Sequence, residues 1–246
     1  MKSIILVLTF LSFSVAASAA EPNSRPTVLA ELFTSEGCSS CPPADALLMK
    51  LDKLQPVAGV QIIVLSEHVD YWNSLGWTDP YSSAQFTQRQ GMYVHSLVAE
   101  SYTPQIVIDG RKEVLGSDEK AIQAAIVKAA ARPKIAVRIV AAKREGKEAV
   151  VNVTVGAPTS SKADVWVAIA DDRDQSSVRN GENKGRTLNH VAVVRSLGKV
   201  GTVTKAAGFE KELRVPLPAQ PGDRRVVVFV AESGGPVVGS AMQELQ

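Results

Sequence analysis

Apolar positions follow two different spacings along this chain. In the first half, continuous apolar runs at 27–33 and 60–65 alternate with segments at 44–54 and 122–129, in which apolar residues recur every three or four positions. A continuous run rich in β-branched residues is typical of a strand buried on both faces, and recurrence at three or four positions is typical of a helix. The first half is therefore predicted to alternate strands with helices.

Two further elements complete the first half. The segment 82–97 is predicted to be a helix, and Asp118 with Glu119 opens a last helix, where acidic residues complement the helix dipole. The pair Asp109-Gly110 separates two short apolar runs and suits a turn with positive φ, so it predicts a β-hairpin.

The helical spacing disappears after Arg132-Pro133. Short apolar runs separated by turn residues then predict strands at 134–139, 150–155, 165–169, 191–194, 213–217 and 226–230. Several short strands at such intervals are typical of an antiparallel sandwich. We therefore expect an α/β domain at 21–131 followed by an all-β, sandwich-like domain at 132–246, which is α+β overall.

The first twenty residues have the pattern of a secretory signal peptide. Lys2 precedes an apolar run at 4–13, and Ala17-Ser18-Ala19 provides a small-residue cleavage site. The run is too short for a membrane-spanning helix, which needs about 20 apolar residues. We expect residues 1–20 to be removed and the protein to be periplasmic or secreted, where disulfides persist, without membrane contact after cleavage.

Composition narrows the classes of partner. Lys plus Arg total 27 against 25 for Asp plus Glu, and the net charge of +2 predicts neither nucleic acid nor an anionic membrane as the main partner. Two cysteines limit the chain to one disulfide, and with three histidines a many-ligand metal cluster is not expected.

Both cysteines lie in Cys38-Ser39-Ser40-Cys41, between the first predicted strand and the first predicted helix. The start of a helix stabilises a thiolate, and cysteines placed there can fall from a pKa of about 8.5 to roughly 3.5–7.5. We expect an exposed Cys38 to act as nucleophile and a covered Cys41 to resolve the mixed disulfide. A bridge that closes so short a loop stabilises weakly, which favours a redox role over a static one.

His68 follows the strand at 60–65 and is expected at the same sheet edge as Cys38. It could move protons during thiol exchange, or bind Cu(I) or Zn(II) together with Cys38 and Cys41, or be a hydrogen-bonded histidine beneath the loop. Asp70 either orients His68 or caps the next turn.

Three further features have simpler interpretations. Glu36 could perturb either cysteine electrostatically, but a solvated loop acid is the simpler expectation, and His95 is expected to be a polar surface residue on a helix. The polar segment 171–189 is predicted to be a long loop between strands, and long loops inside compact domains are often functional.

The element order over 27–131, with the CxxC before a helix and Thr103-Pro104 before the hairpin, resembles the thioredoxin fold. In that superfamily a cis-proline lies opposite the CxxC, and its neighbouring backbone holds the substrate peptide. From base rates alone Pro104 is expected to be trans, because only about 5–6% of X–Pro bonds are cis. The wide separation of Cys41 and Pro104 implies an insertion near 70–95, and Gly37 stands where an aromatic residue usually precedes the first cysteine.

At closer range the chain is similar to a secreted bacterial family catalogued as domain of unknown function 1223. The matching segments are 31–45, 68–73, 102–105 and 181–188. The resemblance implies a thioredoxin-like fold with an added β domain, and it supplies no substrate. It also implies a role for Arg186 and His190 in docking the segment 171–189 onto the first half, with a solvated hairpin loop as the alternative.

We expect an extracytoplasmic thiol–disulfide oxidoreductase that needs no cofactor and acts on protein or small thiol substrates, with an unknown redox partner. The residues expected to carry the chemistry are Cys38, Cys41, Pro104 and His68. Those expected to hold the substrate are Thr103, Trp72 and Asp70. A periplasmic metal carrier that uses Cys38, Cys41 and His68, and a non-enzymatic binding module, are the alternatives.

Overall fold

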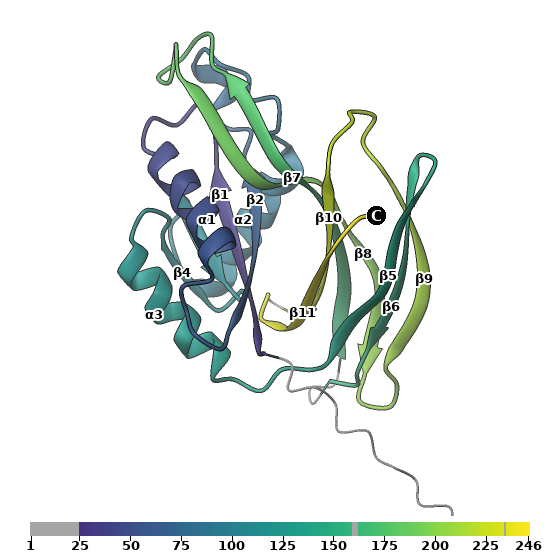
Figure 1. Cartoon of the computed structure of the whole chain (residues 1–246). Helices are drawn as coiled ribbons and strands as arrows, with labels where there is room; N and C mark the ends of the chain where they lie inside the picture. Colours follow the sequence, from purple (N-terminus) through teal and green to yellow (C-terminus); the bar gives the residue numbers. More distant parts are fainter. Residues whose placement is uncertain (1–24, 159–161, 234) are drawn as a thin grey trace, which may run out of the picture.

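A computed structural model of the chain describes residues 25–158, 162–233 and 235–246 (Figure 1). The signal peptide predicted at 1–20 lies outside these residues. In the part of the chain that is described, no helix has the length and apolar character needed to cross a membrane.

The first half contains the predicted alternation of strands and helices. Its elements in chain order are β1 (Thr27–Thr34), α1 (Pro42–Leu54), β2 (Gln61–His68), the short 3-10 helix η1 (Asn73–Leu75), α2 (Ala84–Leu97), β3 (Gln105–Ile108), β4 (Lys112–Leu115) and α3 (Glu119–Ala130). Helix α1 begins with two prolines, whose missing N–H groups are not needed in a first helical turn. The side chains of Ser83 and Asp118 cap the starts of α2 and α3.

The second half is made of strands. They are β5 (Val137–Glu145), β6 (Glu148–Val155), β7 (Lys162–Ser177), β8 (Thr187–Thr204), β9 (Phe209–Pro216), β10 (Arg224–Glu232) and β11 (Val237–Glu244). Strands β7 and β8 have 16 and 18 residues, far more than the apolar runs at 165–169 and 191–194. The predicted loop at 171–189 is therefore wrong, because only 178–186 connect the two strands.

The predicted fold class is also wrong. Eight strands from both halves form one mixed sheet in the order β11-β10-β7-β8-β2-β1-β3-β4, and β5-β6-β9 form a second sheet. Of the described residues, 46% lie in strands and 19% in helices, so the molecule is mainly β. The structure is not a thioredoxin-like α/β domain followed by a separate sandwich, because β8 pairs in parallel with β2 at Ser66 and Val193. The domain boundary near residue 131 stays a prediction.

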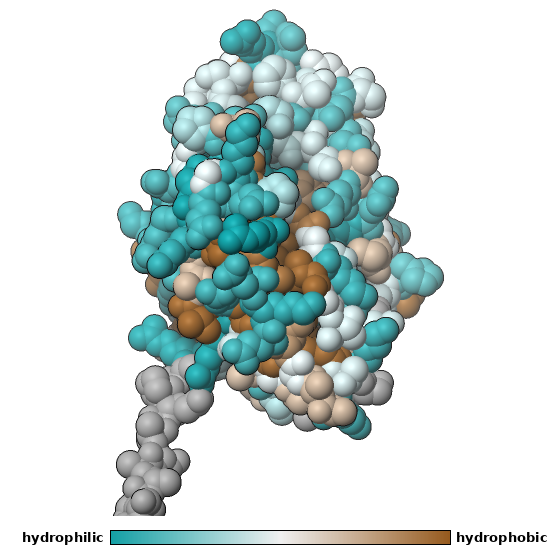
Figure 2. All heavy atoms as spheres, turned by 90° about the vertical axis from the view of Figure 1, so that its right-hand side faces the viewer, coloured by the Kyte–Doolittle hydropathy of each residue, from teal (hydrophilic) through white to brown (hydrophobic). Residues whose placement is uncertain are grey.

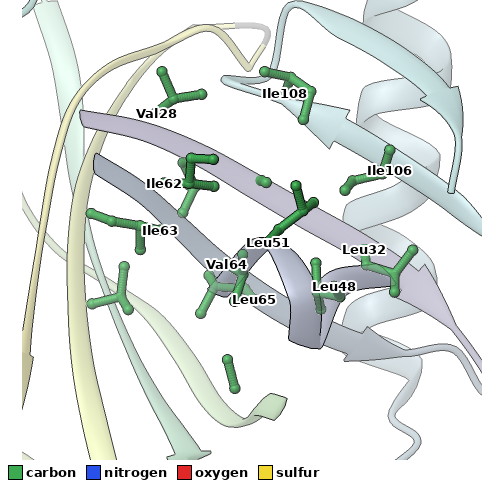
Figure 3. Packing of buried hydrophobic residues seen from close by; sticks show 14 of the residues in the cluster. Val28, Leu32, Leu48, Leu51, Ile62, Ile63, Val64, Leu65, Ile106 and Ile108 are labelled. Atoms are coloured by element: carbon green, nitrogen blue, oxygen red, sulfur yellow. The ribbon is translucent and has the colours of Figure 1, made fainter. Parts of the chain in front are cut away.

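Helices cover both faces of the β1–β2 part of the sheet. Side chains alternate between faces along a strand, so Leu32 and Val64 point to one side and Glu31 and Glu67 to the other. Figure 3 shows Leu48 and Leu51 of α1 beside apolar side chains of β1 and β2, in a cluster that also includes Ile122 and Ile126 of α3. Helix α2 lies on the opposite face, where Arg89 reaches Glu31.

A second core lies between the two sheets. It is built from inward-facing residues of β6, β7 and β10, mostly valines, which alternate with residues on the other face of each strand. Figure 2 views the molecule from the side of β5, β6 and β9 and shows apolar side chains in the middle of this face, framed by polar ones. Both clusters consist of buried residues and use strands of the eight-stranded sheet, which therefore joins the two halves.

Candidate functional site

Cys38 and Cys41 form a disulfide immediately before α1, with their Cα atoms 5.5 Å apart. Cys41 is the residue that caps α1, and its carbonyl accepts the backbone N–H groups of Ala44 and Asp45. Both cysteines have an exposed fraction of 0%, so the expectation of an exposed Cys38 is wrong. The two serines between them are exposed.

The turn that carries Pro104 lies directly against the disulfide. The Thr103–Pro104 peptide bond is cis, so the trans expectation from base rates is wrong. The carbonyl oxygen of Thr103 lies 3.8 Å from Sγ of Cys38 and 3.5 Å from the hydroxyl of Ser40. This proximity follows from the pairing of β3 with β1, which brings Gln105 opposite Phe33, near the end of β1.

Trp72 connects the insertion to the same turn. Its indole Nε1–H donates to Oγ1 of Thr103 at 2.8 Å. A Cβ built on Gly37 would lie 3.0 Å from Cβ of Trp72, so the absence of a side chain before Cys38 lets the tryptophan approach. Trp72 is half-buried and packs against a small cluster that includes Phe33 and Tyr93.

The connection between β7 and β8, residues 178–186, covers the disulfide loop, and we call it the hairpin tip. Nδ2 of Asn183 donates to the carbonyl oxygens of Glu36 and Cys38 at 2.8 and 2.9 Å. Asn183 is fully buried, and its own oxygen accepts from Arg186 at 3.0 Å. The N–H of Ser39 donates to Glu182 at 3.0 Å. Figure 1 shows this hairpin projecting beyond the sheet on the side of α1 and α2.

His68 is fully buried at the end of β2, and its partner is Asp79. Nδ1 of His68 lies 2.7 Å from Oδ2 of Asp79, which also accepts the N–H of Glu36. Burial lowers the pKa of His68, but the Asp79 carboxylate, followed by Asp45 and Glu36, more than offsets this, so the pKa is raised above 6.5. Burial raises the pKa of Asp79, but His68 and the backbone N–H groups of Glu36 and Tyr81 together lower it more, so this pKa falls below 3.8.

A second buried histidine, His190 of β8, lies beside the first. Its Nε2 is 3.2 Å from Oε1 of Glu36, and its Nδ1 is 3.9 Å from Oδ2 of Asp45. The rings of His68 and His190 are 4.8 Å apart. Glu36 is fully buried and also bonds Trp77 and Ser176, so the expectation of a solvated loop acid is wrong.

Asp70 has a different role from either one expected. Its carboxylate accepts from the hydroxyl of Thr87 at 2.6 Å, which ties the loop after β2 to α2. Sequence reasoning missed Asp79, which takes the predicted place of Asp70 beside His68, and it also missed Asn183. Asn183 lies within the family-like segment 181–188, which was the available signal.

The residues do not fit the metal site proposed from the sequence. Among the described residues, no group of three or more His, Cys, Asp or Glu side chains is arranged to hold a metal ion. Both sulfur atoms are engaged in the disulfide, and Nδ1 of His68 is engaged by Asp79.

Comparison with known proteins gives a family but no activity. A family profile described as "Protein of unknown function (DUF1223)" matches residues 29–231. The structure of protein AGR_C_4864 from Agrobacterium tumefaciens is similar at 32% identity with a TM-score of 0.63, over 87% of this chain and 92% of that chain. Spo0M from Bacillus subtilis matches at 13% identity and a TM-score of 0.32, over 46% of this chain and 47% of its own. This similarity is too weak to indicate a shared fold or function. No curated protein matches the chain.

Proposed function

Since the chain belongs to the DUF1223 family, whose function is unknown, its activity must be argued from its site, and we propose that it is a thiol–disulfide oxidoreductase acting outside the cytoplasm. The observation that carries this proposal is the position of the Cys38–Cys41 pair. It lies at the start of α1, next to the Thr103 carbonyl, 3.8 Å from Sγ of Cys38.

The chemistry is an exchange of two electrons with a partner protein. In the reduced protein, the Cys38 thiolate attacks a partner disulfide, an S–S bond forms between Cys38 and the partner, and the partner's other sulfur leaves as a thiolate. The Cys41 thiolate then attacks Sγ of Cys38 and releases the partner as a dithiol. The partner is reduced, the Cys38–Cys41 pair is oxidised, and the reverse sequence oxidises a partner dithiol.

The start of α1 favours the thiolate that this exchange needs. The positive end of the helix dipole lies at Cys41 and stabilises negative charge there. The Thr103 carbonyl and the exposed Ser40 hydroxyl border Cys38 and are the groups that a partner chain would meet first.

Exchange also requires movement of the hairpin tip. Both sulfurs are buried, and Asn183 and Glu182 hold the disulfide loop from above. The described arrangement is therefore the closed form of the oxidised protein, and a partner thiolate reaches Cys38 when the tip is displaced.

Trapping of a mixed disulfide tests the proposal. A Cys41→Ser variant retains the attacking sulfur but cannot release the partner, so we expect covalent adducts that a reductant dissolves. The double variant Cys38→Ser/Cys41→Ser is the matched control and should trap nothing. The trapping experiment is repeated in an Asn183→Ala background, in which the hairpin tip is held less tightly against the disulfide loop. Absence of Cys38-dependent adducts in both backgrounds contradicts the proposal.

A second candidate, a binding module with a static disulfide, is favoured by one observation. The two sulfurs are completely covered, as in an inert structural bridge. Treatment of the folded protein with a mild dithiol separates the two: a pair that stays oxidised until the chain unfolds supports the static module.

A further inference from the structure

Two buried histidines meet at the same end of the sheet as the disulfide. His68 ends β2, His190 lies on β8, and their rings are 4.8 Å apart. Each has one ring nitrogen paired with a carboxylate, Asp79 for His68 and Glu36 for His190. The other nitrogens, Nε2 of His68 and Nδ1 of His190, are buried and make no hydrogen bond within the described part of the chain.

Asp45 connects these histidines to Cys41. The backbone N–H of Asp45 donates to the carbonyl oxygen of Cys41 at 3.1 Å, and helical side chains lean toward the helix start, so the Asp45 side chain is directed toward the turn that holds Cys41. Its Oδ2 is 3.9 Å from Nδ1 of His190, and its Oδ1 accepts from Thr34 at 2.9 Å. Burial raises the pKa of Asp45, although His190 and His68 act to lower it.

Charged and titratable groups face the histidines from every neighbouring element. They are Glu36 after β1, Asp45 on α1, Asp79 and Tyr81 from the insertion, Asp174 on β7 and Arg195 on β8. Four of these six are carboxyls, and Arg195 lies over the Tyr81 ring at 5.4 Å. A further negative charge in this buried, acidic region is unfavourable unless a proton arrives with it.

We propose that His68 and His190 form a proton store for the Cys38–Cys41 pair, which takes up a proton when the disulfide is opened. When a dithiol reduces the pair, its two sulfurs become a disulfide and lose two protons. One of these protons goes to the Cys41 sulfur, while Cys38 remains a thiolate. The second goes to the histidine pair, so charge balances and no other co-reactant is needed.

Titration of the histidine ring protons by NMR tests the proposal without a substitution. In the reduced protein, with excess dithiothreitol present, the pKa of at least one of His68 and His190 should be higher than in the oxidised protein. His95, the third histidine, is exposed on α2 and should titrate identically in both states. Equal pKa values of both buried histidines in the two states would overturn the proposal.

The pH dependence of the redox equilibrium gives an independent measure. Below about pH 8, the midpoint potential of the pair, determined by equilibration with dithiothreitol at each pH, should fall more steeply with pH in the wild type than in His190→Gln. The difference is up to tenfold in the equilibrium constant of the protein couple per pH unit, equal to about 30 mV per pH unit for a two-electron couple. Asp45→Asn should weaken the same dependence, and His95→Gln should leave it unchanged. Identical dependence in the wild type and His190→Gln overturns the proposal.

The proton store rests on the proposed function only in needing a reducible disulfide. Proton coupling with dithiothreitol but no trapped partner supports the store and contradicts the oxidoreductase. Trapped partners without proton coupling contradict the store alone. A pair that the dithiol cannot reduce in the folded protein contradicts both.

Discussion

At the scale of single residues, burial lets neighbouring ionisable side chains shift each other's pKa strongly. His68 and Asp79 are both completely buried, and each shifts the pKa of the other. Leaving one member of such a pair buried without its partner is strongly destabilising, because the remaining charge has neither water nor a counter-ion.

The His68–Asp79 pair predicts a specific pH profile of stability. The raised pKa of His68 stabilises the fold fully below 6.5, the ordinary histidine value, and this contribution is lost as pH rises through the higher folded value. The lowered pKa of Asp79 stabilises the fold above 3.8 and is lost as pH falls through the lower folded value. The pair should therefore contribute most between these two ordinary values.

His68→Gln should lower the free energy of unfolding by about 3–5 kcal/mol near pH 6 and remove the decline above it. Urea unfolding at several pH values measures this. His95→Gln is the control, since that histidine is exposed, and an unchanged alkaline decline in His68→Gln would contradict the assignment.

The disulfide itself should contribute little to stability. It closes a loop with a sequence separation of 3, for which the loop-entropy relation gives about 2 kcal/mol. Cys38→Ala/Cys41→Ala should therefore lower Tm by roughly 4–8 °C for a chain of this size. A much larger loss, measured by thermal unfolding, would favour a structural bridge.

The sequence led to some site residues and not to others, for a physical reason. Cys38, Cys41 and Thr103-Pro104 stand out because the motif, the helix start and the turn are local patterns. Asp79 and Asn183 reach the site through contacts with segments that are distant in the sequence, and Asn183 is 145 positions from Cys38. Neither residue is part of a motif or regular spacing that would distinguish it from a polar residue in a solvated loop.

At the scale of elements, the β7–β8 hairpin controls access to the disulfide. Its outer part is polar and was predicted to be a loop, because an exposed ribbon has no apolar alternation to identify it. The three helices were confirmed, since each has an apolar side with a clear period; α2 was expected at 82–97 and occupies Ala84–Leu97.

Asn183→Ala should speed reduction of the disulfide by small thiols about tenfold. The substitution removes two hydrogen bonds that hold the hairpin tip closed, each contributing about 0.5–1.5 kcal/mol net. The rate is measured with excess dithiothreitol under native conditions. Asn189→Ala is the control, because Asn189 is exposed on the same hairpin. Within the described part of the chain, its side chain bonds only Gln175. Equal rates in the two variants would show that the tip does not limit access.

Helix α2 is held to the sheet by a buried ion cluster. Arg89 bonds Glu31 at 2.6 Å and lies 3.4 Å from Glu67, whose pKa burial raises well above its ordinary value. Arg89→Ala should lower the free energy of unfolding by about 3–5 kcal/mol, because the buried Glu31 loses its counter-ion. Lys50→Ala breaks an exposed pair with Glu119 and should change it by less than about 1 kcal/mol. Chemical denaturation of both variants checks the contrast.

At the scale of the whole molecule, one sheet joins segments that the sequence assigned to different domains. Hydrophobic patterns identify strands but not the strands they pair with. The strands of both halves were therefore predicted, while the pairing that joins the halves was missed. The direct β2–β8 pairing is a single pair, Ser66 with Val193, and has no sequence signature. Helix α1 also contacts β8, so the first half depends on the second for part of its covering.

A fragment of residues 25–131 should therefore fail to fold by itself, whereas 25–246 should unfold in one cooperative transition. The fragment would expose the edge of β2 and the apolar surface that β8 covers in the whole protein. Circular dichroism and thermal unfolding of both proteins measure this. A cooperative transition in the fragment would contradict it and support the domain boundary near residue 131.

The order in which the chain is made gives the hairpin tip one more consequence. Asn183 is synthesised 145 residues after Cys38, so a growing chain displays its two thiols before their cover exists. An oxidant meets them freely in that interval and only with difficulty afterwards. The oxidation state of a mature molecule would then depend on the compartment in which it folded. Molecules that folded in a reducing compartment would keep their thiols after transfer to an oxidising one.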